Sequence, residues 1–192
     1  FAYAQDDNQQ ITLLAVNYFY KNLKQFGKVK TSAPLSKCTT FRIGGPARFL
    51  VEVTDINKLV ELLNFLSEEG QDFFVLGGGS NLLMSDEGFE GVVIKIKCSN
   101  VEIVGNVIVC DAGVLLGAVV NMATEKSLTG MEWGAGIPGT IGGAVYGNSG
   151  AMGKDMSRSV EKVEVWKNGE VLEMTQEECD FTYVDKEIAA KC

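Results

Sequence analysis

The fold is decided by the stretch Phe73-Phe74-Val75-Leu76-Gly77-Gly78-Gly79-Ser80-Asn81. Its first four residues form a short apolar run, which is typical of a buried strand, and the run passes directly into three glycines. Without side chains, successive N–H groups of this loop can turn toward one concavity, and Ser80 and Asn81 add side-chain donors. We therefore expect a strand that ends in a phosphate-binding loop. A tight turn without a ligand is the alternative that a lone triple glycine favours.

The segments around this stretch predict an α/β unit followed by two hairpins and a further helix. Leucines at helical spacing follow a capping residue at Thr54 or Asp55, and Gly-Asn and Asn-Gly pairs separate short apolar runs in the second half. The expected helices are Gln9–Phe26, 54–69 and Gly113–Lys126. The expected strands are Phe49–Val53, Phe73–Leu76, Val92–Ile96, Val101–Val104, Val107–Cys110, Val160–Trp166 and Glu170–Met174.

Composition excludes several classes of function. The 192 residues carry a net charge of −8, which argues against a nucleic-acid-binding protein. The chain has no histidine, so that Ser-His-Asp and Cys-His catalysis within it are excluded and the commonest metal ligand is missing. The five cysteines are dispersed without a C-x-x-C pair, which argues against zinc and favours free thiols in a reducing cytosol. No apolar run is long enough to predict a membrane span.

A second glycine-rich segment, residues 134–153, holds eight glycines in twenty residues. Gly134-Ala135-Gly136-Ile137-Pro138-Gly139 matches G-x-G-x-x-G as a string. However, a poor strand precedes it, and Pro138 stands where a Rossmann loop enters its helix, so we reject the Rossmann interpretation. The loop at Gly77 is not a Walker A motif either, because no Gly-Lys-Ser/Thr follows.

Three segments together resemble the UDP-N-acetylenolpyruvoylglucosamine reductases. They are Pro34-Leu35-Ser36-Lys37-Cys38-Thr39-Thr40-Phe41-Arg42-Ile43-Gly44-Gly45-Pro46-Ala47, Val75-Leu76-Gly77-Gly78-Gly79-Ser80-Asn81-Leu82-Leu83, and Gly134-Ala135-Gly136-Ile137-Pro138-Gly139-Thr140-Ile141-Gly142-Gly143-Ala144-Val145-Tyr146-Gly147-Asn148. The resemblance implies an α+β protein with an FAD-binding fold of the vanillyl-alcohol-oxidase (PCMH) type. In that fold two α/β subdomains hold FAD between them.

The resemblance also implies an activity in the cytoplasm. NADPH reduces FAD, and the flavin passes hydride to the enolpyruvyl double bond of a UDP-sugar, giving UDP-N-acetylmuramate for peptidoglycan synthesis. The implied partner is this small-molecule substrate, with no nucleic acid, membrane, metal or partner protein. The implied division is an N-terminal helical segment at 1–30, FAD-binding subdomains at 31–98 and 99–183, and a short tail at 184–192.

The same resemblance assigns site residues. Arg158 falls where the family has its active-site arginine, and Tyr183 falls where it has a substrate-binding tyrosine. The residues implied to bind FAD are Thr40, Phe41, Arg42, Ile43, Gly44, Gly45, Gly77, Gly78, Gly79, Ser80, Asn81, Leu82, Ala112, Gly113, Gly136, Ile137, Pro138, Gly139, Thr140, Ile141, Gly142, Gly143 and Ala144.

The chemistry suits these residue types. Hydride addition to the enol ether builds negative charge at the α-carbon and its carboxylate, and a fixed guanidinium stabilises that charge through charge-assisted hydrogen bonds. Without the family resemblance, we would expect Arg158 to be a surface arginine paired with Asp155 or Glu161. We would likewise expect Tyr183 to be an aromatic residue of the core or its rim.

The sequence departs from the family after Tyr183. The family continues with Arg and shortly Ser, and then with a third domain that supplies a proton-donating serine and a glutamate. Here Val184-Asp185-Lys186-Glu187 follows and the chain ends at Cys192. Either the sequence is a truncated or gap-closed version of a longer one, which we favour, or it is a variant with a short tail. The alternatives to the reductase are an FAD-binding module without full turnover and another flavin oxidoreductase of the same fold.

Overall fold

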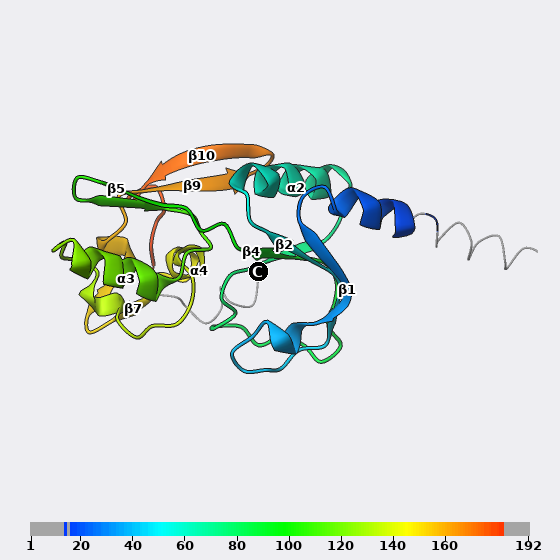
Figure 1. The fold of residues 1–192 in the computed structure, drawn as a ribbon, viewed down its shortest axis with the longest axis horizontal. Helices are drawn as coiled ribbons and strands as arrows, with labels where there is room; N and C mark the ends of the chain where they lie inside the picture. Colours follow the sequence, from blue (N-terminus) through cyan, green and yellow to red (C-terminus); the bar gives the residue numbers. More distant parts are fainter. Residues whose placement is uncertain (1–13, 15, 183–192) are drawn as a thin grey trace, which may run out of the picture.

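The structure is a computed structural model that describes residue 14 and residues 16–182. We call residues 16–98 the first half and residues 99–182 the second half. The first half contains β1 (Lys28–Pro34), the 3-10 helix η1 (Leu35–Lys37), β2 (Pro46–Val53), α2 (Ile56–Glu68), β3 (Phe73–Leu76) and β4 (Phe89–Ile96). The second half contains β5 (Val101–Val104), β6 (Val107–Cys110), α3 (Leu116–Glu125), η2 (Glu132–Gly134), α4 (Ile141–Tyr146), β7 (Gly150–Ala151), β8 (Lys154–Asp155), η3 (Met156–Arg158), β9 (Lys162–Lys167) and β10 (Glu170–Thr175). Figure 1 shows the two halves beside each other, with the β9-β10 hairpin reaching α2.

A four-stranded sheet forms the centre of the first half. Its strand order is β1-β2-β4-β3; β2 and β3 both pair with β4 in parallel, and β1 pairs with β2 in antiparallel. Strand β4 is central, and its Val92, Val93 and Ile94 are all fully buried, as expected for a strand covered on both faces. Strand β3, which precedes the glycine loop, is last in this order and lies at an edge of the sheet.

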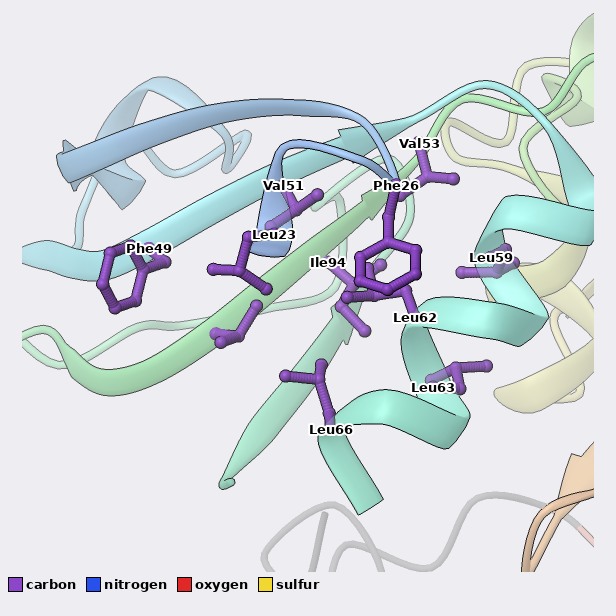
Figure 2. Packing of buried hydrophobic residues seen from close by; sticks show 11 residues of the cluster. Leu23, Phe26, Phe49, Val51, Val53, Leu59, Leu62, Leu63, Leu66 and Ile94 are labelled. Carbon is purple, nitrogen blue, oxygen red and sulfur yellow. The ribbon is translucent and has the colours of Figure 1, made fainter. Parts of the chain in front are cut away.

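Helix α2 covers one face of this sheet with four buried leucines: Leu59, Leu62, Leu63 and Leu66. The Asp55 side chain caps the helix by accepting from the N–H of Asn57 at 2.8 Å and of Lys58 at 3.0 Å. Such a cap satisfies donors that the first turn leaves without partners. Figure 2 shows the leucines beside Leu23 and Phe26, with Val51 and Ile94 of the sheet in the same cluster. The predicted helix, its cap and its apolar face are confirmed.

Truncating this core is expected to destabilise the chain strongly. Leu62 is fully buried, so Leu62→Ala should lower the free energy of unfolding by about 2–5 kcal/mol through lost burial and the remaining cavity. Urea unfolding followed by circular dichroism measures this change. The matched control is Ile56→Ala on the same helix, because Ile56 is 38% exposed. This change should lower the free energy of unfolding by roughly 1 kcal/mol or less. Equal losses for the two variants would contradict this description of the core.

Two further clusters complete the core. The opposite face of the sheet packs Leu50, Leu76 and Val93 against η1 and the segment after the glycine loop. In the second half, Trp133 and Met156 pack with residues of α3 and α4. Both predicted hairpins are confirmed, and their turns contain Gly105, Asn168 and Gly169 at positive φ. Within residues 16–182, none of the helices has the length and apolar character needed to cross a membrane.

Several predicted boundaries were wrong. No strand was predicted before Phe49, but Lys28–Pro34 forms the edge strand β1; its side chains are largely exposed, so no apolar alternation marks it. Helix α3 begins at Leu116 rather than Gly113, because Gly113 packs against the Cys98 carbonyl. The helix predicted at Gln9–Phe26 ends at residue 23, and its predicted start lies outside the described residues. Gly27 lies against the backbone of β2, where an added Cβ would be 2.3 Å from the Glu52 oxygen.

Candidate functional site

The glycine loop at the end of β3 joins two other loops. The Thr40 N–H donates to the Gly79 carbonyl at 2.9 Å, and the Ser80 hydroxyl donates to the Pro138 carbonyl at 3.0 Å. Ser80 and Pro138 are 58 residues apart in the sequence. The three segments that carry glycine-rich motifs therefore meet at one place, between the two halves.

Close packing explains why this junction needs glycines. A Cβ on Gly77 would lie 2.5 Å from the Thr140 hydroxyl, and one on Gly78 would lie 2.9 Å from the Gly139 Cα. Gly79 has φ of +71°, and its Cβ would lie 2.0 Å from the Cys38 carbonyl oxygen. The sequence motif predicts that these glycines let a ligand approach the backbone. The structure gives them a further role, since they let the three loops contact one another.

The same loop retains unused hydrogen-bond donors. Within residues 16–182, no acceptor is bonded to the backbone N–H of Gly78, Gly79, Ser80 or Asn81. A group of consecutive N–H donors without protein acceptors favours an anionic, oxygen-rich ligand such as a diphosphate. The loop therefore fits the phosphate part of the cofactor that the resemblance implies.

The amino end of α4 has a different role. Its first N–H groups are already bonded: Ile141 donates to Val114 at 2.8 Å and Gly142 donates to Ala112 at 2.9 Å. The Thr140 hydroxyl accepts from the Gly143 N–H at 3.4 Å. Because these donors are occupied, the helix end is not a second anion site. It instead holds residues 112–114 against residues 140–144, so the predicted residues Ala112 and Gly113 lie beside the glycine-rich segment.

The predicted stretch from Thr40 to Gly45 divides into two parts. Thr40 is bonded to the glycine loop, and Phe41 and Ile43 after it are 61% and 43% exposed, which leaves apolar surface beside that loop. Gly44 and Gly45 are bonded instead to Ser36 and Leu35 of η1. Of the remaining predicted residues, Leu82 packs into the cluster beneath the sheet. Gly136 has φ of +81°, and no atom lies within 4 Å of where its Cβ would be, so a ligand could approach its backbone from that direction.

Arg158 lies at the end of η3, in a turn held on both sides. Before it, the Ser157 N–H donates to the Asn148 side chain at 3.0 Å. After it, the Ser159 hydroxyl donates to the Gly130 carbonyl and accepts from the Trp133 ring N–H, both at 3.0 Å. The turn therefore fixes the backbone of Arg158 beside the end of α4.

The guanidinium of Arg158 is exposed, and none of the described carboxylates lies within ion-pair distance of it. The pairing with Asp155 or Glu161 that a surface arginine would make is thus absent from this part of the chain. Asp155 instead accepts from the Ser157 hydroxyl. The cation remains available to an anionic ligand.

Tyr183 lies outside the described residues. The residue before it is held, because the Asn148 amide donates to the Thr182 carbonyl at 3.2 Å. Asn148 therefore connects the Arg158 turn to the chain that leads to Tyr183. The sequence motifs did not identify Asn148 as a positioning residue. Its position at the end of the Gly134–Asn148 segment, just after α4, could have pointed to this role.

The cysteines behave as expected from their spacing. Cys38, Cys98, Cys110 and Cys179 are free thiols, and Cys192 lies outside the described residues. Burial raises the pKa of Cys98 and of Cys110, and Asp111 raises both further. These thiols are therefore protonated at neutral pH and poorly nucleophilic. Within residues 16–182 there is also no group of three or more cysteine, aspartate or glutamate side chains placed to hold a metal ion.

Comparison with known proteins identifies relatives. A family model described as the FAD binding domain matches residues 47–175. The UDP-N-acetylenolpyruvoylglucosamine reductase of Caldanaerobacter subterraneus subsp. tengcongensis is 41% identical over 165 residues, which are 85% of this chain and 55% of that protein. The chain thus spans about half the length of the curated relatives that it matches.

Solved structures agree with the family match. The crystal structure of UDP-N-acetylenolpyruvylglucosamine reductase (MurB) from Thermus caldophilus superposes with a TM-score of 0.65 and 34% identity, covering 81% of this chain and 55% of that one. Aclacinomycin oxidoreductase superposes with a TM-score of 0.53 at 20% identity, covering 77% of this chain and 33% of that one, and shows likeness of fold alone. The resemblance and the predicted α+β fold of the vanillyl-alcohol-oxidase type are confirmed. Because the family model covers more than half of its 192 residues, the chain belongs to the FAD-binding domain family.

Proposed function

We propose that the chain is the FAD-binding part of a UDP-N-acetylenolpyruvoylglucosamine reductase. The observation that carries this proposal is the set of N–H groups at Gly78–Asn81 that have no acceptor among the described residues, where three glycine-containing loops meet. The similarity to reductases over 85% of the chain supports the choice among flavoproteins. NADPH is proposed as the reductant and a UDP-sugar as the substrate.

The loop residues divide the work of holding FAD. The N–H groups of Gly78–Asn81 would donate to the diphosphate, because they are consecutive donors without described acceptors. The exposed apolar side chains of Phe41 and Ile43 offer contacts to a flat ring. The remaining assigned stretches, 112–113 and 136–144, would line the same site, since α4 holds them together.

Bound FAD supplies the hydride chemistry between NADPH and the enolpyruvyl double bond. The protein's own contribution is electrostatic. Arg158 would place an unpaired cation at the substrate carboxylate, where negative charge grows as the double bond is reduced. Tyr183 would bind the substrate, and Asn148 would hold the two positions in register through its bonds to Ser157 and Thr182.

The proposal includes an organisation of the chain. Residues 31–98 and 99–183 are proposed as the two FAD-binding subdomains, after an N-terminal helical segment at 1–30 and before a tail at 184–192. Free cysteines and the use of NADPH support a location in the cytoplasm. The proposed role is in peptidoglycan precursor synthesis, without a partner protein, nucleic acid, metal or membrane.

Absorption spectroscopy tests the proposal directly. The purified chain mixed with FAD should retain a yellow, protein-bound flavin after gel filtration. Anaerobic NADPH should bleach it, and UDP-N-acetylenolpyruvoylglucosamine should restore the oxidised spectrum. A chain that retains no flavin would overturn every flavoprotein assignment.

A second candidate is an FAD-binding module that does not complete turnover. The observation that favours it is the match to the FAD binding domain at residues 47–175, which supports cofactor binding by itself and does not depend on turnover. This candidate predicts bound flavin that NADPH bleaches but the UDP-sugar does not restore. Another flavin oxidoreductase of the same fold would instead be reoxidised by a different acceptor.

A further inference from the structure

The second half also contacts the first half at the end of β3 opposite the glycine loop. Trp166 of β9 donates its ring N–H to the Asn64 side chain of α2 at 2.6 Å, across 102 residues of sequence. Its ring also meets the Phe73 ring edge-on, with centroids 6.2 Å apart at 71°. Trp166 is partly buried against the core of the first half. Figure 1 shows β9 ending beside α2.

These contacts and the glycine junction hold the same strand at its two ends. Phe73 is the first residue of β3, and Gly77 follows its last residue. Trp166 packs on the first end, whereas Thr140 and Gly139 pack on Gly77 and Gly78 at the other. At about 3.3 Å per residue, the two contacts lie roughly 13 Å apart along the strand. Two separated contacts fix an orientation that a single contact leaves free to rotate.

The hairpin that carries Trp166 depends on this contact. Among the described residues the β9-β10 sheet has two strands, and an isolated two-stranded hairpin is marginally stable in water. Its exposed cross-strand ion pair, Lys162 with Glu173, adds little. Packing of Trp166 on the first half therefore supports the hairpin and adds a second contact between the two halves, beside the glycine junction.

We infer that Trp166 is a positioning residue for FAD binding, which acts through Asn64 and Phe73 on the strand that carries the Gly77–Asn81 loop. This inference rests on the proposed function. Trp166 and Asn64 are not among the residues assigned to the cofactor. Their effect on affinity arises because FAD binds only when the two halves are docked, so the apparent Kd rises as the docked fraction falls.

The test measures the Kd for FAD by titration at 20 °C, with each variant first shown to be folded by circular dichroism. Trp166→Phe keeps an aromatic ring on Phe73 but removes the donor, and Asn64→Ala removes the acceptor. Each should raise Kd by up to about fivefold, the limit set by the loss of one partly buried hydrogen bond. Asn64→Asp retains an acceptor and should restore affinity to nearly that of the wild type.

Two further variants separate positioning from general stability. Trp166→Phe combined with Asn64→Ala should raise Kd no more than either change alone, because both remove the same bond. Lys162→Ala removes the exposed ion pair of the same hairpin, away from α2, and should leave Kd unchanged. Lower melting temperatures with unchanged Kd values in the Trp166 and Asn64 variants would overturn the inference and leave the proposed function standing. A wild-type chain that binds no FAD would overturn both.

Discussion

Replacement of Gly79 by alanine is expected to abolish FAD binding and to destabilise the chain by about 3 kcal/mol or more. Gly79 has φ of +71°, and the new Cβ would lie 2.0 Å from the Cys38 carbonyl oxygen. The neighbouring Thr40 N–H is bonded to the Gly79 carbonyl, so relieving the clash separates the loops that form the site. Urea unfolding and FAD titration measure the two effects.

Gly70→Ala is the matched control. Gly70 also has positive φ, at +59°, but no atom lies within 4 Å of where its Cβ would be. The free energy of unfolding of the Gly70→Ala variant should fall by roughly 1–2 kcal/mol from backbone conformation alone, and its FAD affinity should stay unchanged. If Gly79→Ala bound FAD as tightly as Gly70→Ala, the loop would not be the cofactor site.

Replacement of Arg158 by alanine is expected to slow reoxidation of the reduced flavin by the UDP-sugar about 10²–10³-fold, the usual cost of removing one electrostatic donor from a transition state. FAD binding and reduction by NADPH should remain, because the Gly78–Asn81 donors, not Arg158, are proposed to hold FAD. Anaerobic stopped-flow spectroscopy follows the two half-reactions separately.

Arg158→Lys and Arg48→Ala are the controls for this prediction. Lysine keeps the charge without the bidentate fork and should recover part of the rate. Arg48 is also exposed, but it lies over the Phe49 ring on β2, so its loss should leave the rate unchanged. An unchanged reoxidation rate in Arg158→Ala would remove this residue from the mechanism.

Local patterns predicted the elements whose structure depends on neighbouring residues. Helix α2 followed from a capping residue and leucines at helical spacing, and both hairpins followed from glycine and asparagine in their turns. Strand β1 was missed because its exposed residues show no apolar face. Helix α4 was missed because it has six residues and two of them are glycine, a poor helix former.

The motifs identified the residues of the candidate site. They did not predict the long-range contacts that place these residues. The family resemblance groups Gly77–Asn81 with Gly136–Ala144. The contacts of Gly77 with Thr140 and of Asn64 with Trp166 join residues far apart in the chain. No local pattern encodes such pairs, because they depend on how the complete halves pack. Asn148 and Trp166 were missed as positioning residues for this reason.

The bond between Ser80 and Pro138 has a consequence for synthesis of the protein. The ribosome makes Ser80 58 residues before its partner, a delay of roughly 3–12 s at the usual elongation rate. During that interval the nascent glycine loop has none of the contacts that residues 138–140 later provide. Capture of FAD during translation is therefore expected only after the third glycine segment has left the ribosome.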